Sequence, residues 1–184
     1  MAFAICCAVA ASAEVYNISI TANSEHLLKE TPLKKLKDHI LTLCDDNGGN
    51  RGTMTVFIDS LSEVYDDADG LGYNDDSTSA PFAGKTPYEC SLLLKQMCEE
   101  NSENCFDGDT FAILDERSLK DGTMLLVEEP EEEDGGEKHS VRVTFKIAEL
   151  QMALWGSGKA GVVDARERAQ QTDDGVLRAG MHVL

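Results

Sequence analysis

The sequence predicts a single α/β domain, in which helices pack on a mixed central sheet of about five strands. Three observations support this prediction. The length of 184 residues fits one domain. A hydrophobic content of 42% beside 27% charged residues supplies enough apolar material for a core. Segments with strand and helix periodicity follow in the order β-α-β-α-β-β-β-α, and the alternation in the first half favours parallel strands joined by helices.

The first half of the chain contains two predicted strands and two predicted helices. Residues 14–22 alternate in hydrophobicity, and residues 53–60 are apolar on both faces, which is typical of a strand covered on both sides. Residues 32–44 carry an apolar stripe at helical spacing. A second helix is expected after Thr86 and Glu89, which have the spacing of a capping box.

The second half is richer in strands. We expect strands at 109–118, 123–129 and 141–145, because each is apolar on one or both faces. A helix is expected over 147–154, and a weaker one over 160–172. The later strands add antiparallel edges to the sheet, which makes the predicted sheet mixed.

The two ends of the chain are predicted to lie outside the domain, which spans 14–172. Residues 1–13 are apolar or small, and we interpret them as a leader, while residues 173–184 are expected to form a loose tail. A signal peptide cleaved after Ala13 is one interpretation of the leader. It lacks Lys and Arg and is short for that purpose, so we expect a cytoplasmic protein, with secretion as the alternative.

The net charge of −18 narrows the set of partners. A strongly acidic surface repels nucleic acid and anionic lipid, so we expect neither nucleic-acid nor membrane binding. The partner that such a surface favours is a protein with a basic surface. The acid is concentrated in two stretches without hydrophobic periodicity, at 62–78 and 128–137, both predicted to be solvated loops.

A glycine-rich stretch at 155–161, WGSGKAG, resembles a phosphate-binding loop. The P-loop motif requires a glycine at the position of Ala153 and Ser or Thr at the position of Ala160. It also requires a strand before the loop, whereas a helix is predicted here. We therefore interpret the glycines as the end of that helix and expect no nucleotide cofactor.

Two aspartates end predicted strands and are candidate ligands. Asp59 and Asp115 would both lie at the carboxyl edge if their strands are parallel, where α/β sheets bind ligands. Two carboxylates there suit Mg²⁺, and Arg117 is a third candidate site residue. The alternative is that each aspartate only forms local caps and turns, as strand-end acids often do.

Four cysteines remain outside the leader: Cys44, Cys90, Cys98 and Cys105. An even number allows two disulfides in an oxidising compartment. Cys90 and Cys98 fall on one predicted helix, where buried thiols are common core residues. The chain has no Cys-x-x-Cys pair, so it offers no zinc or thioredoxin-like motif.

Several blocks of the sequence together resemble a family. In chain order they are PLKKLKDHILTLC, TMTVFIDS, KTPYECSLLLKQMC, DTFAILDERSLKDGTMLLV and VRVTFKIAELQMALW. They are similar to a group of uncharacterised proteins of filamentous fungi, and the late portion resembles a small bacterial domain of unknown function. The resemblance runs from about Glu14 to Arg178. It implies a cytoplasmic protein that begins near the first predicted strand, and it implies no catalytic residues.

We conclude from the sequence that the chain is most simply a non-enzymatic, acidic interaction module. One alternative is a metal-dependent enzyme that uses Asp59 and Asp115 to hold Mg²⁺. The other is a small secreted protein with two disulfides. The sequence contains no complete catalytic motif that would favour an enzyme.

Overall fold

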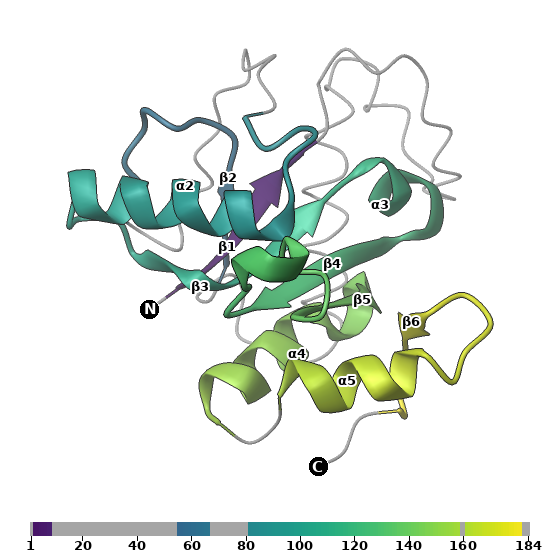
Figure 1. Cartoon of the computed structure of the whole chain (residues 1–184). Coiled ribbons are helices and arrows are strands. Elements are labelled where there is room, and N and C mark those ends of the chain that lie inside the picture. Colours follow the sequence, from purple (N-terminus) through teal and green to yellow (C-terminus); the bar gives the residue numbers. More distant parts are fainter. Residues whose placement is uncertain (1, 9–54, 67–80, 159–160, 182–184) are drawn as a thin grey trace, which may run out of the picture.

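The computed structural model of the chain describes residues 2–8, 55–66, 81–158 and 161–181. It confirms an α/β domain with a mixed central sheet and helices packed on it (Figure 1). The expected strand at 14–22 and helix at 32–44 lie outside the described residues.

Among the described residues, six strands form the sheet, in the spatial order β2-β1-β3-β4-β5-β6. Their bounds are Ala2–Cys7 for β1, Thr55–Ile58 for β2, Phe106–Leu114 for β3, Thr123–Glu128 for β4, Ser140–Thr144 for β5 and Val176–Leu177 for β6. The strands β2, β1 and β3 are mutually parallel. For β2 and β3 this agrees with the parallel strands predicted for the first half of the sheet. The pairs β3–β4 and β4–β5 are antiparallel, and β6 returns parallel to β5.

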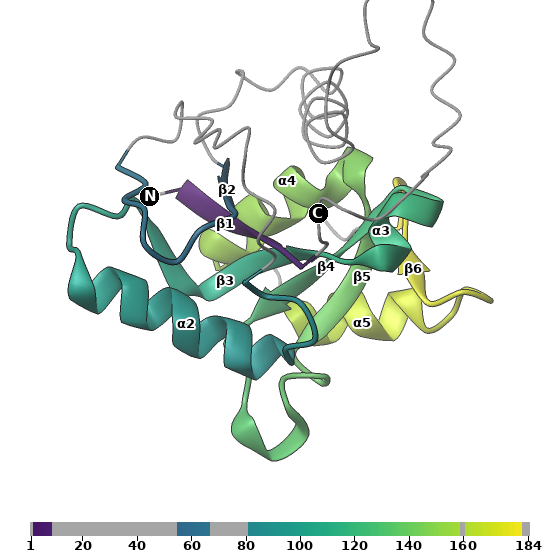
Figure 2. The same ribbon diagram turned by 90° about the horizontal axis from the view of Figure 1, so that it is seen from above.

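Helices cover both faces of the sheet. They are α2 (Pro87–Glu100), α3 (Glu116–Asp121), α4 (Phe145–Gly156) and α5 (Val162–Ala169), with a short 3₁₀ helix η1 (Glu132–Asp134) between β4 and β5. Figure 2 shows α2 on one face of the sheet and α4 on the other. The predicted capping box at the start of α2 is present, because Thr86 and Glu89 each accept the other's backbone N–H.

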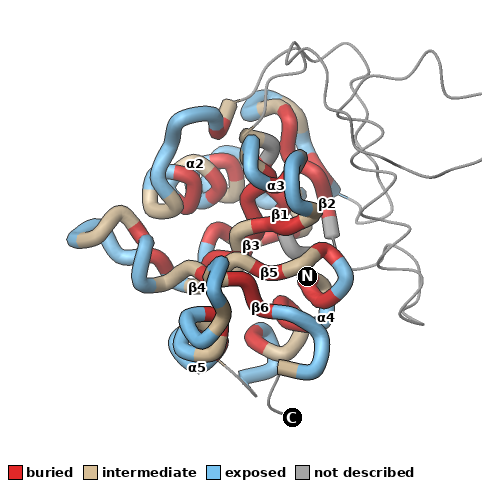
Figure 3. Tube along the Cα trace, turned by 90° about the vertical axis from the view of Figure 1, so that its right-hand side faces the viewer, coloured by how far each residue is buried: buried red, intermediate tan, exposed pale blue. Residues whose placement is uncertain are grey.

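The core consists of two clusters, one on each face of the sheet, because successive side chains of a strand point to opposite faces. Figure 3 shows where buried residues lie along the strands and helices. In β1, Ile5 joins the cluster that includes α4 and α5, while Ala4 and Cys6 join the cluster that includes α2. Phe57 of β2 lies on the α4 side, and its neighbours Val56 and Ile58 lie on the α2 side. Strands buried on both faces need apolar residues at consecutive positions, which is why the sequence shows no polar alternation there.

The predicted domain boundary at residue 14 is wrong, because Ala2–Cys7 forms β1 between β2 and β3. An apolar run without alternation resembles a leader, but here it is a strand covered on both faces. The loose tail expected over 173–184 is also wrong for its described part. Val176 and Leu177 form β6 and are 0% and 1% exposed, a pair too short to show periodicity in the sequence.

Two strand ends differ from the prediction. The strand expected at 109–118 runs from Phe106 to Leu114, because Asp115 caps a helix that begins at the next residue. The strand expected at 141–145 ends at Thr144, because Phe145 is the first residue of α4.

Candidate functional site

The two candidate aspartates lie at the same edge of the sheet. Asp59 directly follows β2 and Asp115 directly follows β3, and both strands are parallel to β1. The chain leaves β1 and β3 toward opposite halves of the sheet, and ligands of α/β folds bind at such a switch point. β1 separates the two aspartates, so their backbones lie about 10 Å apart, at two strand spacings.

Asp59 is a buried residue at the start of a turn that Tyr65 organises. The carboxylate is on a residue that is 1% exposed, and its Oδ1 accepts the phenol hydroxyl of Tyr65 at 3.0 Å. The same phenol oxygen accepts the backbone N–H groups of Asp59 and Ser60 at 3.2 and 3.1 Å. Burial, and then the negative charge of Asp59, raise the pKa of Tyr65, so the phenol keeps its proton. The phenol therefore holds the turn after β2 in place.

Asp115 caps helix α3. Its Oδ1 accepts the backbone N–H of Ser118 at 2.9 Å, and the Ser118 hydroxyl accepts the N–H of Asp115 at 3.0 Å. Gly122 caps the C-terminus of the helix, because it has a φ of 69° and donates its N–H to the Ser118 carbonyl. These two bonds agree with the alternative interpretation, in which the aspartate forms local caps and turns.

Asp115 also forms an ion pair with Arg142. The Nη1 of Arg142 lies 3.1 Å from Oδ1, and its Nη2 donates to Oδ2, so the contact is bidentate. Burial alone would raise the pKa of Asp115, but the hydrogen bonds from Arg142 and Ser118 outweigh it and lower the pKa. Because Arg142 comes from β5, the pair directs the Asp115 carboxylate away from β1 and from Asp59.

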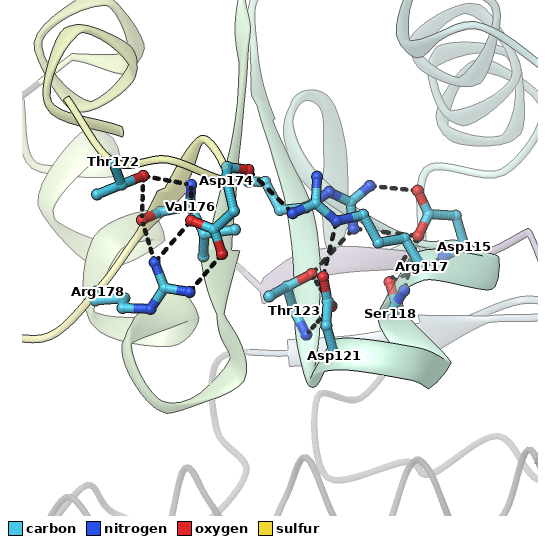
Figure 4. A network of polar contacts seen from close by, with 10 residues as sticks. Asp115, Arg117, Ser118, Asp121, Thr123, Thr172, Asp174, Val176 and Arg178 are labelled. Carbon is cyan, nitrogen blue, oxygen red and sulfur yellow. Dashed lines mark hydrogen bonds and ion pairs between the residues drawn. The ribbon is translucent and has the colours of Figure 1, made fainter. Parts of the chain in front are cut away.

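Arg117 belongs to a chain of polar contacts that begins at Asp115 and reaches the C-terminal segment (Figure 4). Its Nε donates to Asp121 at 2.7 Å, and its Nη2 donates to the carbonyl of Asp174 at 3.1 Å. The Asp174 carboxylate in turn binds Arg178, whose Nη1 and Nη2 donate at 2.9 and 2.6 Å. These guanidinium bonds hold the pKa of Asp174 below its usual range. The network anchors the segment that ends in β6 to helix α3.

The structure thus brings Asp115 and Arg117 into one network but does not bring Asp59 to them. A single Mg²⁺ holds its oxygen ligands at about 2.1 Å, so it bridges carboxylates only when they converge. In the described parts of the chain, no group of three or more His, Cys, Asp or Glu side chains is placed to hold a metal ion. Sequence reasoning missed Arg142 and Tyr65, because neither lies near its aspartate in a recognisable motif.

A second candidate site is the acidic loop, defined here as residues 129–137 between β4 and β5. Five glutamates in it are exposed: Glu129, Glu131, Glu132, Glu133 and Glu137. Figure 2 shows this loop extending away from the sheet. Lys138 and His139 follow the loop, and the Nε2 of His139 lies 3.8 Å from the Oε2 of Glu131. The loop is therefore a concentrated patch of negative charge.

The sequence predicted that the acidic loop is simply solvated. In the structure the loop is also anchored to the domain by backbone hydrogen bonds. The N–H of Tyr88 on α2 donates to the Gly135 carbonyl at 3.0 Å, and the N–H of Glu129 donates to Asp109 at 2.7 Å. Within the loop, the Asp134 carboxylate accepts the N–H groups of Gly136 and Lys138, both at 2.9 Å. These backbone bonds, the one from Lys138 first, lower the pKa of Asp134. The glutamates are thus displayed on an ordered turn.

Gly136 allows the acidic loop to approach α2. Its φ is 85°, a conformation that side chains rarely adopt. A Cβ at this position would lie 2.7 Å from the Cβ of Pro130 and 2.9 Å from that of Pro87. The close contact therefore requires glycine.

The described part of the glycine-rich stretch, residues 155–158, ends helix α4 and forms a turn after it, as predicted. Helix α4 ends at Gly156, and Gly158 has the positive φ of 68° typical of helix ends. Lys159 and Ala160 lie outside the described residues.

Comparison with known protein families, with curated proteins and with solved structures found no match to this chain. Within the described ranges, none of the helices is long and apolar enough to cross a membrane.

Proposed function

We propose that the protein is a non-enzymatic interaction module that binds a basic protein surface through the acidic loop. The observation that carries this proposal is the display of five exposed glutamates on a turn that is hydrogen-bonded to α2 and β3. An ordered turn loses less conformational entropy on binding than a flexible acidic segment would, so more of the electrostatic attraction contributes to affinity.

The negative charge of the chain favours a basic protein as the partner. The net charge of −18 attracts basic partners at long range, and the acidic loop concentrates that field at one place. The same field opposes approach to nucleic acid and to anionic membranes, so we propose neither as a partner. Lysine and arginine side chains on a protein are the groups that such a loop would bind.

The polar network at the carboxyl edge has a structural role in this proposal. Asp115 and Arg117 are engaged with Arg142, Asp121 and the Asp174 carbonyl. They hold α3 and β6 in place, and the interaction surface lies at the β4–β5 loop instead.

The test compares two sets of charge changes in one binding assay. The probe is a fluorescently labelled peptide of alternating lysine and arginine, titrated with the full chain at several salt concentrations. The loop variant carries E131Q, E132Q and E133Q. The control variant carries E99Q, E100Q and E103Q, which remove three exposed charges near the end of α2. Both variants have the same net charge.

We expect the loop variant to bind the peptide about tenfold more weakly, because three exposed ion pairs contribute about 0.5 kcal/mol each. The control variant should stay within about twofold of the wild type, and the salt dependence of binding should fall only in the loop variant. Equal losses in both variants would mean that overall charge, and not the acidic loop, determines binding.

The proposed function also concerns the cellular compartment of the protein. We propose that the protein is cytoplasmic and keeps residues 1–13, since Ala2–Cys7 is the strand between β2 and β3. The proposed resemblance to the fungal family, which implies a cytoplasmic protein, supports this location. The intact mass of the native protein from its source would show whether these residues are present.

A further inference from the structure

Four cysteines among the described residues are thiols in the structure: Cys6, Cys90, Cys98 and Cys105. Cys6 and Cys90 are buried in the cluster between the sheet and α2. Burial raises the pKa of the Cys90 thiol to about 12, which leaves almost no thiolate to react at neutral pH. Cys90 and Cys98 are eight residues apart on one helix, or about 12 Å, beyond the reach of a disulfide.

Cys98 and Cys105 differ from the buried pair in exposure and in position. Both are half-buried at the margin of the same cluster. Cys98 lies in the last turn of α2, and Cys105 immediately precedes β3. The Cys98 Sγ donates to the carbonyl of Phe106, the residue next to Cys105, at 3.2 Å. The Cys98 thiol therefore lies against the backbone that carries Cys105.

We propose that Cys98 and Cys105 form a reversible intramolecular disulfide, which fastens the end of α2 to the start of β3. Only residues 99–104 connect them, which are the last two residues of α2 and the turn after it. The helix and the strand therefore hold the two cysteines close to the two ends of one short turn. Such a site can be oxidised and reduced without unfolding the domain, because neither thiol lies in the centre of the core.

The disulfide site adjoins the anchor of the segment 59–66. Asn104 accepts the N–H of Tyr65 at 2.8 Å and donates to the Met97 carbonyl at 2.9 Å. The N–H of Cys105 donates to the Tyr65 carbonyl at 2.8 Å. Oxidation would constrain the turn that holds Tyr65, and through its phenol the turn at Asp59. The redox state of the pair is thereby coupled to the turn that follows β2.

The reaction requires a disulfide oxidant, for which we name oxidised glutathione. One protein thiolate attacks a glutathione sulfur, forms a mixed disulfide and releases one glutathione thiolate. The second protein thiolate then attacks the protein sulfur of that mixed disulfide and releases the other glutathione. Two protein thiols are oxidised and one glutathione disulfide is reduced to two thiols. The two protons lost by the protein thiols are taken up by the two glutathione thiolates that are released.

The test uses the folded full chain with oxidised glutathione at mildly alkaline pH. An alkaline pH is chosen because burial, with the nearby Asp107 and Cys105, raises the pKa of Cys98 and lowers its thiolate fraction. The protein is alkylated without reduction and digested with trypsin and a glutamate-specific protease. The chain can be cut between the two cysteines at Glu99, Glu100 and Glu103, so their disulfide joins two separate peptides.

We expect the joined peptides to contain Cys98 and Cys105, while Cys90 is alkylated only after denaturation. The joined species should vanish in both Cys98→Ser and Cys105→Ser and persist in Cys90→Ser. A second control is the wild-type protein oxidised in urea. In the unfolded chain, Cys98 and Cys105 should form disulfides with other cysteines as well as with each other. Three results with the folded wild type would overturn the proposal. The first is glutathione bound to either thiol without joined peptides, and the second is two thiols that do not react. The third is a disulfide between Cys98 or Cys105 and another cysteine. The decisive measurement is made on the wild type, so it does not depend on the folding of any variant.

Discussion

The guanidinium of Arg142 on β5 lies against the carboxylate of Asp115, with Nη1 3.1 Å from Oδ1. The Arg142 side chain is only 10% exposed, and that of Asp115 is 33% exposed. The same Nη1 donates to the Thr123 hydroxyl at 3.2 Å. The pair spans β4, which lies between β3 and β5, so it connects two strands that are not neighbours. It fixes the start of α3 relative to the far half of the sheet.

Asp115→Asn should lower the free energy of unfolding by about 1.5–3 kcal/mol, since a largely buried guanidinium loses its charged partner. Denaturant titration followed by circular dichroism measures this change. Asp109→Asn is the matched control, because Asp109 pairs with Lys95 at 2.6 Å with both side chains about half exposed. An exposed pair contributes less than about 1 kcal/mol. Equal losses in the two variants would contradict a structural role for the Asp115–Arg142 pair.

The stability provided by Asp115 should depend on pH in one direction. Its pKa is lowered in the folded state, relative to about 3.9 for an unfolded aspartate. The carboxylate therefore stabilises the fold fully above the unfolded pKa, and this contribution is lost as the pH falls through the folded pKa. The gap in unfolding free energy between wild type and Asp115→Asn should shrink when the pH is lowered from about 5 to about 2. A gap that stays constant over this range would show that protonation of Asp115 is not involved.

Ile5→Ala tests whether the segment at the start of the chain is a central strand. Ile5 is 2% exposed and packs in the core cluster on the α4 side. Its truncation should cost about 2–5 kcal/mol in unfolding free energy. Leu150→Ala is the control, because Leu150 is 52% exposed and should change stability by less than about 0.5 kcal/mol. If Ile5→Ala were as mild as the control, β1 would not be a core strand.

The parts of the fold that follow from local patterns were predicted. The helix that starts after Thr86 has a capping box and an apolar stripe, and both signals lie within a few residues of each other. The mixed sheet follows from the order of strands and helices, because parallel neighbours need a helical connection and consecutive strands do not.

The parts that depend on distant contacts were not predicted. Nothing near Asp115 in the sequence indicates that Arg142, 27 residues later, is its partner. Val176 and Leu177 form β6 only because β5 offers an edge, and two residues show no period of their own. The apolar start of the chain has the composition of a leader, and only the sheet distinguishes β1 from one.

The protein should bind a basic partner through the ordered geometry of the acidic loop, and not through the net charge of the chain alone. Gly136→Ala tests this prediction, because a Cβ there would collide with Pro87 and Pro130 while the net charge stays the same. Gly158→Ala is the control, since Gly158 also has a positive φ, of 68°, but has open space around its Cβ position.

The measurement is the affinity of both variants for the lysine- and arginine-rich peptide, with hydrogen exchange at the Tyr88 N–H to report whether the loop stays docked. We predict that Gly136→Ala exposes this N–H to exchange and weakens binding by about three- to tenfold through lost preorganisation. Gly158→Ala should bind as the wild type does. Unchanged binding by Gly136→Ala, with the Tyr88 N–H exchanging freely, would contradict the account.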